Sequence, residues 1–370
     1  MTAQGTSSDS DDVLRILRPD GTIEPGRAPG LTVAEVVELY RAMVRTRMLD
    51  ERLVMLQRQG RIGFHIGSLG EEATVLGTAW VMRPQDFIFP CYREFGAALL
   101  RGMTLQSYLD NMFGNGRDLA KGRQMPDHIT ARGARFGSVS SPIGTQITHA
   151  VGYAWSCKLQ RQDVVTLVWF GDGATSSSEF HNGMNFAGVY QVPALLVCRN
   201  NGWAISVPTG GQTASESIAE KGRAYGVRSV RCDGNDLFAV VAAGREAVAR
   251  ASRGEGPTFL EALTYRMSGH STSDDPNAYR LDDELEPWKK RDPIARVRAW
   301  LVGQGAWDDG LDAELEGSFD VEVKAAIASA EEAARPELST LFDDVYAQLP
   351  AHLREQRDQL LRGPRPAGDH

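Results

Sequence analysis

Two continuous apolar runs in the middle of the chain constrain its fold more than any other feature. Residues 164–170 read VVTLVWF and residues 194–198 read ALLVC, without alternating polar positions. Strands this apolar are typical of a parallel sheet that is covered on both faces. Between them, residues 176–189 have the character of a helix that ends near Gly188, with Pro193 beyond. This order makes a βαβ unit, so we predict an α/β fold with a parallel sheet flanked by helices.

Further elements continue the pattern on both sides of this unit. Thr32 is a suitable N-cap for a helix whose apolar residues recur at helical spacing. Residues 227–230 and 258–262 are typical of further strands, and residues 236–251 of a helix between them. Asp292 followed by proline predicts another helix start.

The chain divides into three predicted parts. Residues 1–30 are polar and rich in Pro and Gly, and we expect a flexible N-terminal arm that docks on a partner. Residues 31–345 form the predicted α/β domain, and residues 346–370 the C-terminal tail.

Charge and hydropathy exclude several classes of protein. The formal net charge is -8 over 370 residues, which argues against a nucleic-acid-binding surface. No apolar run approaches the roughly 18 residues that span a membrane. The polar N-terminal stretch has neither an apolar signal core nor an Arg-rich transit pattern, which favours the bacterial cytoplasm. The four cysteines are far apart, so we expect buried free thiols rather than zinc ligands or disulfides.

Polar clusters follow both apolar runs at the points where the strands end. Residues 171–173 read GDG and residues 199–202 read RNNG. Ligands of open α/β sheets bind beyond the carboxyl ends of the strands, so we expect Asp172 and Asn201 to face one another across a crevice. Carboxylate and amide oxygens suit Mg²⁺, which proteins commonly share with phosphates. The sequence therefore predicts a magnesium site that holds a diphosphate.

Neighbouring features favour an anion at the same place. The glycines permit close approach of the backbone, the following helix points its N-terminus there, and Arg199 can donate charge-assisted hydrogen bonds. A lone Gly-Asp-Gly is more often a plain turn, but its placement together with the Asn pair is far more specific. The usual glycine-rich nucleotide loops do not occur in the sequence.

Residues 171–206, GDGATSSSEFHNGMNFAGVYQVPALLVCRNNGWAIS, resemble the thiamine diphosphate motif. Over roughly residues 31–350 the chain is similar to the alpha subunits of 2-oxo acid dehydrogenases. Four more motifs in the right order support this resemblance: YRE at 92–94, LAKGRQMPDH at 119–128, SVSSPIGTQ at 138–146 and YRMSGHSTSDDPNAYR at 265–280. The resemblance implies the thiamine-diphosphate-binding fold of that family.

The resemblance also implies roles for the matching positions. Mg²⁺ would be held by Asp172, Asn201 and the backbone carbonyl of Trp203. In branched-chain members a potassium ion orders a loop, whose matching residues here are Ser140, Pro142, Thr145 and Gln146. The positions matching cofactor contacts are Tyr92, Arg93, Ser141, Ile143, Asp172, Gly173, Ala174, Arg199, Asn201 and His270.

The substrate side of the site follows from the same resemblance. Phe64, Tyr92, Met125 and His128 match residues that line the substrate pocket, and His128 and His270 are the expected catalytic residues. From the residues alone, Phe64 and Met125 could equally be core side chains, and His128 a loop histidine. Ser271 lies in a loop that matches the phosphorylated loop of mitochondrial relatives.

The family's reaction is the oxidative decarboxylation of a 2-oxo acid, with transfer of the acyl group to the lipoyl group of a separate acyltransferase. The resemblance implies an assembly of two alpha and two beta chains, with the beta subunit completing each site. The segment at 121–128 looks like the branched-chain group. An alpha subunit acting on pyruvate or acetoin is the alternative, and a scaffold without catalysis is a second one that the presence of Asp172, Arg199 and Asn201 disfavours.

Overall fold

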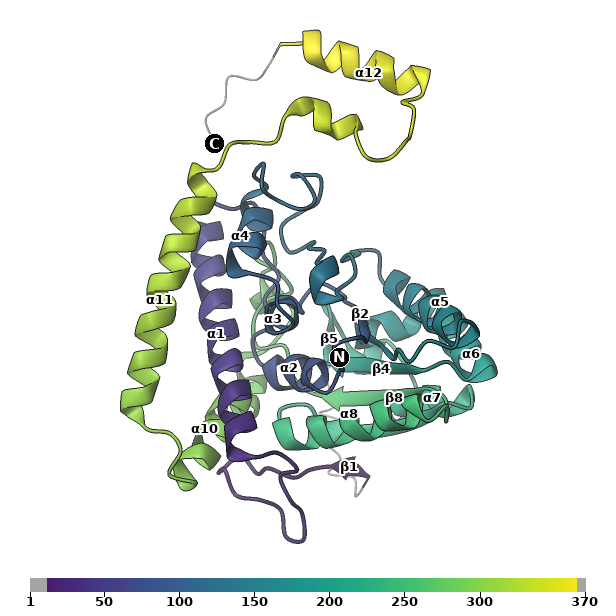
Figure 1. Cartoon of the computed structure of the whole chain (residues 1–370). Coiled ribbons are helices and arrows are strands. Elements are labelled where there is room, and N and C mark those ends of the chain that lie inside the picture. The colour runs from purple at the N-terminus through teal and green to yellow at the C-terminus, as the bar shows by residue number, and fades with distance from the viewer. Residues whose placement is uncertain (1–11, 365–370) are drawn as a thin grey trace.

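A parallel sheet of six strands forms the centre of the described chain, which in this computed structural model covers residues 12–364 (Figure 1). The predicted α/β fold is confirmed, including the direct pairing of the two apolar strands. Neighbours in the sheet follow the order β1 (Val13–Leu14), β7 (Arg228–Asp233), β8 (Thr258–Leu263), β4 (Ala194–Asn200), β3 (Thr166–Gly171) and β2 (Phe87–Phe89), and every pairing is parallel.

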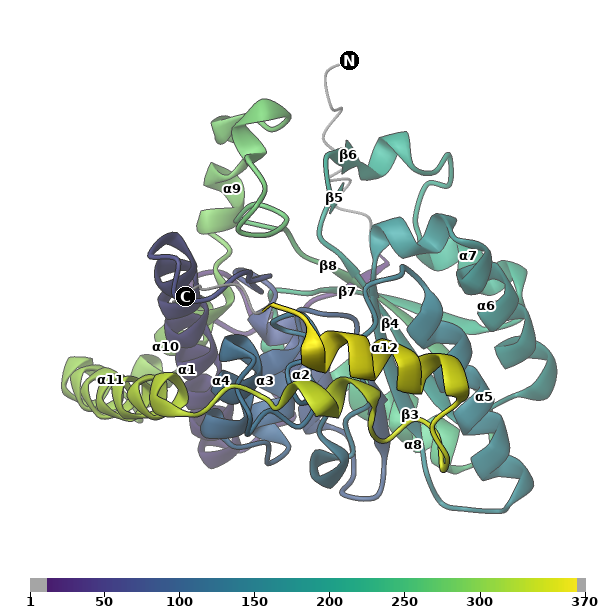
Figure 2. The same cartoon turned by 90° about the horizontal axis from the view of Figure 1, so that it is seen from above.

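Helices cover both faces of this sheet (Figures 1 and 2). Side chains of β3 alternate between two buried clusters, with Leu167 and Trp169 on one face and Val168 and Phe170 on the other. This double burial explains why the strand carries no polar alternation. The first face packs against α2 (Glu72–Trp80) and α8 (Leu237–Ser252), and the second against α5 (Thr145–Leu159) and α6 (Ser178–Tyr190).

The remaining helices pack mainly beyond the first face. Thr32 caps α1 (Val33–Arg58) in a capping box with Glu35, and Asp292 caps α10 (Pro293–Gly303), so both predicted helix starts are confirmed. The other elements are α3 (Phe95–Leu100), α4 (Leu105–Phe113), β5 (Trp203–Ala204), β6 (Val207–Pro208), α7 (Ala219–Ala224), α9 (Glu286–Lys289), α11 (Asp309–Glu332) and α12 (Ala351–Arg362), with a 3₁₀ turn at Asp172–Ser176.

The segment after residue 11 is docked onto the domain, in contrast to the flexible arm expected over residues 1–30. Its strand β1 pairs with β7, and Ile16 and Leu17 are buried. The backbone N–H groups of Ile16 and Leu17 donate to the Asp236 carboxylate over 2.5 and 2.7 Å. A carboxylate from a distant part of the chain thus satisfies this backbone, which local composition does not reveal. Residues 1–11 of the predicted arm lie outside the described residues.

Helix α6 differs from its predicted limits at both ends. It begins after the N-cap Ser177, because residues 172–176 form a 3₁₀ turn, and it continues past Gly188 to Tyr190. Gly188 serves packing rather than termination, since a Cβ there would lie 2.0 Å from the carbonyl oxygen of Tyr225. Gln191 takes the left-handed conformation that ends the helix.

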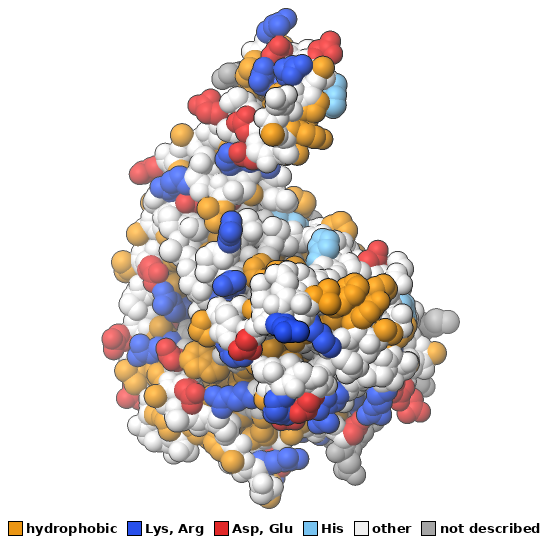
Figure 3. Space-filling view, turned by 45° about the vertical axis from the view of Figure 1, so that its right-hand side comes forward, with side chains coloured by type: hydrophobic (Ala, Val, Ile, Leu, Met, Phe, Trp, Pro, Cys, Tyr) orange, Lys and Arg blue, Asp and Glu red, His pale blue; other side chains and the backbone are white. Residues whose placement is uncertain are grey.

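The C-terminal part of the chain projects from the body beyond α11 (Figures 1 and 3). Helix α12 has no buried residue. The predicted tail from residue 346 includes this helix. The last six residues of the tail, 365–370, lie outside the described residues. All four cysteines are buried free thiols, as expected: Cys91, Cys157, Cys198 and Cys232.

Candidate functional site

The predicted metal ligands lie at the carboxyl ends of neighbouring strands. Gly171 of β3 is in register with Arg199 of β4, so Asp172 and Asn201 follow adjacent strand ends. Thr209 bridges the two ends, because its hydroxyl lies 3.1 Å from Asp172 Oδ2 and 3.3 Å from Asn200 Oδ1. The ends of these two strands are therefore joined through Thr209.

One carboxylate oxygen of Asp172 has no hydrogen-bond partner. The side chain is 1% exposed, and its Oδ2 accepts a 2.7 Å hydrogen bond from Gln212 Nε2, whereas Oδ1 is buried without a partner. Burial raises the pKa of this carboxyl, against the hydrogen bonds from Gln212 and Thr209 that lower it. An unpaired buried carboxylate oxygen is unfavourable, and a cation would relieve it. The residues present therefore fit a metal ion at this point.

The expected metal ligands are oxygen donors, the kind that Mg²⁺ takes in proteins. The described residues contain no group of three or more His, Cys, Asp and Glu side chains arranged to hold a metal. A metal beside Asp172 would thus rely on amide and carbonyl oxygens, as expected for Asn201 and the Trp203 carbonyl. Mg²⁺ accepts such a set and completes its shell with phosphate and water.

Asn201 is oriented by a buried ionic cluster. Its Nδ2 donates to Glu71 Oε1 over 2.8 Å, and its Oδ1 accepts from the backbone N–H of Trp203 over 3.2 Å. Arg199 pairs with Glu71 and, over 2.6 Å, with Glu94. Nε of this guanidinium is buried without a partner.

The packing of the protein leaves no room for a side chain at Gly173. A Cβ at this position would lie 2.6 Å from Cβ of Ala204 in β5. The loop that follows β4 therefore closes directly over the Gly-Asp-Gly turn. Ala174, the next predicted contact, is buried in the second core cluster.

Arg93, Tyr92 and His270, three of the predicted diphosphate contacts, lie together in the structure. Arg93 is buried and donates to the Gly67 carbonyl over 2.5 Å and to the His270 carbonyl over 3.0 Å. The rings of Tyr92 and His270 meet edge to face at 6.0 Å. Burial and then the cations Arg93 and Arg266 lower the pKa of His270 to about 4. His270 is therefore neutral at physiological pH.

His128 contacts Ser141, which joins the predicted substrate and cofactor motifs. Its Nδ1 lies 3.0 Å from the Pro126 carbonyl and donates there, and in the neutral ring Nε2 accepts from the Ser141 hydroxyl. Met125 is 50% exposed and Ile143 is 46% exposed. The reading of Met125 as a plain core residue is therefore wrong, whereas Phe64 is half-buried.

The loop expected to hold potassium offers one unpartnered oxygen. Gln146 is buried and donates from Nε2 to the Trp169 carbonyl over 3.0 Å, which leaves its Oε1 buried without a partner. The Thr145 hydroxyl donates to the Pro142 carbonyl over 3.0 Å. Ser140 lies half-buried in the same loop.

The chain is similar to known proteins over most of its length. The profile of the dehydrogenase E1 component family matches residues 40–339. The chain belongs to the dehydrogenase E1 component family. It is 44% identical over 321 residues to the Arabidopsis thaliana 2-oxoisovalerate dehydrogenase subunit alpha 2, mitochondrial, covering 86% of this chain and 68% of that protein. The mitochondrial 2-oxoisovalerate dehydrogenase subunits alpha of Homo sapiens and Mus musculus are 41% and 40% identical over 360 residues, covering 97% of this chain and 81% of each relative.

Several residues of this E1 component's site were not predicted from its sequence. Glu71 and Glu94 neutralise Arg199, while Thr209 and Gln212 hold Asp172. Arg266 is buried beside Arg93 and His270, with Nε and Nη1 lacking partners. The signal that could have revealed Glu71 is its position directly before an apolar helix, because a carboxylate buried there needs a cation.

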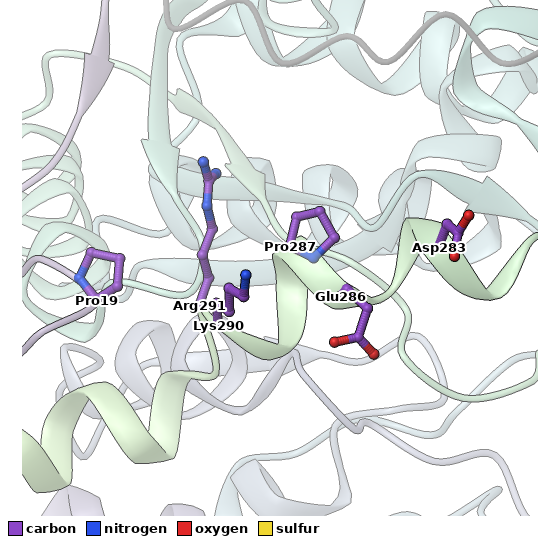
Figure 4. Close-up of a pocket in the computed structure, with 6 residues that line it drawn as sticks. All are labelled: Pro19, Asp283, Glu286, Pro287, Lys290 and Arg291. Carbon is purple, nitrogen blue, oxygen red and sulfur yellow. The ribbon is translucent and has the colours of Figure 1, made fainter.

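A cavity among the described residues lies away from the candidate site. It has a volume of about 530 Å³ and is open to solvent, lined by Pro19, Asp283, Glu286, Pro287, Lys290 and Arg291 (Figure 4). It contains none of the E1 site residues. Among the described residues, no helix is both long and apolar enough to cross a bilayer.

Proposed function

We propose that this chain is the alpha subunit of a branched-chain 2-oxo acid dehydrogenase, the activity classified as EC 1.2.4.4. The observation that carries the proposal is the buried, unpartnered Oδ1 of Asp172 beside Asn201, at paired strand ends in an E1 family member. The names of the relatives, 2-oxoisovalerate dehydrogenase subunits alpha, supply the substrate class. The reaction would be oxidative decarboxylation, followed by acyl transfer to a lipoyl group.

The chain's own residues account for holding the cofactor. Asp172, Asn201 and the Trp203 carbonyl would bind Mg²⁺, and Arg93, His270 and Arg199 Nε would contact the diphosphate. Thiamine diphosphate, when bound, supplies the carbon chemistry of decarboxylation. Neutral His270 can donate or accept a proton at neutral pH, and His128 is held in one tautomer by Pro126. The unpartnered Gln146 oxygen supports potassium as a second cation.

The substrate pocket would favour a branched side chain. Phe64 is half-buried and Met125 is an adaptable apolar side chain. Such a wall gains about 0.8 kcal/mol for each methylene that it buries, which pyruvate cannot supply. Pyruvate and acetoin dehydrogenase alpha subunits remain the alternative within the family. A scaffold without catalysis is disfavoured, because Asp172, Asn201 and Arg199 are present and oriented at one strand edge.

A partner chain would complete the site. Met125 and Ile143 are about half exposed although both match residues expected beside the cofactor or substrate. We therefore propose a beta subunit that covers them, in an assembly of two alpha and two beta chains, and a lipoylated acyltransferase as acyl acceptor. The isolated alpha chain should then decarboxylate nothing. The names of the relatives place them in mitochondria, so the bacterial cytoplasm stays a prediction for this chain.

The test is turnover by the assembled enzyme. The chain is co-purified with its beta-type partner, and kcat/KM is measured for 3-methyl-2-oxobutanoate and for pyruvate. We expect the ratio of kcat/KM for 3-methyl-2-oxobutanoate to kcat/KM for pyruvate to be above one. It should be roughly 10–200 at most, because discrimination by methylene burial is modest. A ratio below one would assign the chain to the pyruvate group. Full turnover by the alpha chain alone would contradict the shared site.

A further inference from the structure

His65 is a fully buried histidine that lies between two carboxylates. Its Nε2 lies 2.8 Å from Asp50 Oδ1, and its Nδ1 lies 3.0 Å from Asp127 Oδ2. The side chain is 0% exposed. None of these three residues is among the positions to which the family resemblance gave a role. A buried group of two carboxylates and one imidazole is unusual enough to require an explanation.

The geometry requires the charged form of His65. A neutral imidazole has one N–H and could donate to only one carboxylate, whereas an imidazolium donates to both. Burial lowers the pKa of His65, but the charges and hydrogen bonds of Asp127 and Asp50 outweigh it and raise the pKa to about 10. Tyr108 is the other titratable group at this cluster, and its hydroxyl donates to Asp127 Oδ1 over 2.6 Å. The imidazolium therefore persists throughout the physiological pH range.

The two carboxylates also hold the backbone that follows His65. Asp127 Oδ2 accepts from the N–H of Ile66, and Asp50 Oδ2 accepts from the N–H of Ser68, each over 2.7 Å. A Cβ on Gly67 would lie 2.4 Å from Asp50 Oδ1, so only glycine lets the loop approach α1 this closely. Residues 65–68 are thus held by α1 on one side and by the 114–128 loop on the other.

The loop that carries His270 joins the same cluster. The N–H of His65 donates to the Thr272 hydroxyl over 3.1 Å, and the N–H of Thr272 donates to the His65 carbonyl over 3.0 Å. Asp127 has a φ of +67°, a strained conformation for a non-glycine residue, which its side-chain contacts stabilise. His65 therefore connects three loops that otherwise lie far apart in the sequence.

Each of these loops carries a residue of the proposed site next to its contact with His65. Phe64 precedes His65, His128 follows Asp127, and His270 lies two residues before Thr272. We propose that His65 is a positioning residue that, through its bonds to Asp50 and Asp127, holds Phe64 and His128 at the spacing required by the 2-oxo acid. This inference rests on the proposed function. It adds a determinant of substrate binding that does not itself touch the substrate.

The metal side of the site lies apart from this cluster. Asp172 and Asn201 are held by Thr209, Gln212 and Glu71, and none of these residues contacts His65, Asp50 or Asp127 in a hydrogen bond. The cluster reaches the cofactor contacts through backbone groups, at the Gly67 carbonyl that accepts from Arg93 and at the bonds between His65 and Thr272, and it does not reach the metal ligands. Loss of the His65 side-chain bonds should therefore affect substrate binding more than metal-dependent cofactor binding. If the His65 cluster had a purely structural role, its loss would affect substrate binding and cofactor binding alike, or neither of them.

The experiment compares Asp50→Asn and His65→Gln in the assembled enzyme with the beta chain. KM and kcat for 3-methyl-2-oxobutanoate are measured beside the Kd of Mg²⁺-thiamine diphosphate. We expect KM to rise about 10-fold or more, since small displacements of positioning groups have effects of this size, while Kd changes less than about 3-fold. Tyr108→Phe, which keeps the ionic contacts, should raise KM about 3-fold and serves where the other variants do not assemble.

Asp236→Asn is the matched control, because Asp236 is also a buried carboxylate that accepts backbone N–H groups, but at the docked N-terminal strand. It should lower the melting temperature and leave KM unchanged. An unchanged KM in the cluster variants that assemble, or a parallel rise of KM and Kd, would overturn the inference while leaving the proposed function intact. A wild-type enzyme that turns over no 2-oxo acid would instead overturn the proposed function, and the inference with it.

Discussion

Nη2 of Arg93 lies 3.0 Å from the backbone carbonyl of His270 and 3.2 Å from Nδ1 of its ring. Because Arg93 only donates, Nδ1 accepts and the remaining ring proton resides on Nε2. One guanidinium thus sets both the backbone position and the tautomer of His270. A cation at this distance also disfavours the imidazolium, in agreement with the pKa of about 4.

This relationship predicts how His270 affects stability in acid. Its pKa is lower in the folded protein than in the unfolded chain, so the contribution is fully present above about pH 6.5 and is lost as the pH falls toward about 4. We expect a loss on the order of 1–2 kcal/mol after solvent screening. Unfolding of the wild type and of His270→Gln at pH 7 and pH 5 checks this. An equal loss in both proteins would contradict the prediction.

The unpartnered oxygen of Asp172 predicts opposite effects on stability and binding. Asp172→Asn removes an uncompensated buried charge, so the cofactor-free protein should be as stable as the wild type or more so. Affinity for Mg²⁺-thiamine diphosphate should fall by at least about 100-fold. Gln212→Leu, which removes a hydrogen bond to Asp172, should lower it about 10- to 100-fold. Calorimetric titration measures both, and an Asp172→Asn enzyme with unchanged affinity would exclude the metal site.

The loop that carries Ser271 predicts sensitivity to negative charge. Asp274 in this loop accepts a 2.6 Å hydrogen bond from the N–H of His270, so another carboxylate nearby should repel it and the cofactor diphosphate. Ser271→Glu should lower kcat/KM about 10-fold or more, since small displacements beside the site have such effects. Ser273→Glu places the same charge at an exposed position of the same loop. Similar activities of the two variants would show that the position of the charge is unimportant.

Substitutions at two helical glycines, Gly188 in α6 and Gly152 in α5, can be compared to test the packing between α6 and the segment before β7. Gly188→Ala would place a Cβ 2.0 Å from the Tyr225 carbonyl oxygen and should destabilise the protein by about 1–3 kcal/mol. Gly152 lies in α5 with open space around it, and Gly152→Ala should stabilise by roughly 0.5–1 kcal/mol. The melting temperatures should therefore shift in opposite directions. A shift of the same sign would refute the packing role of Gly188.

The sequence by itself determined the features that depend on neighbouring residues. The apolar character of β3 and β4 predicted their buried pairing, and Thr32 and Asp292 predicted two helix starts, because burial periodicity and capping operate within a few residues. The strand ends then predicted that Asp172 and Asn201 lie at the same edge of the sheet, since parallel strands share one ligand-binding edge.

Only the tertiary structure decided which distant side chains compensate one another. Asp236 binds the backbone of Ile16 across 220 residues, Arg199 is neutralised by Glu71 across 128, and His65 is held by Asp127 across 62. A buried charge is stable only where an oppositely charged or hydrogen-bonding group from another element contacts it. Local sequence patterns do not show which distant residue makes that contact. For this reason the docked N-terminal strand and the His65 cluster could not be predicted from the sequence and were found only in the tertiary structure.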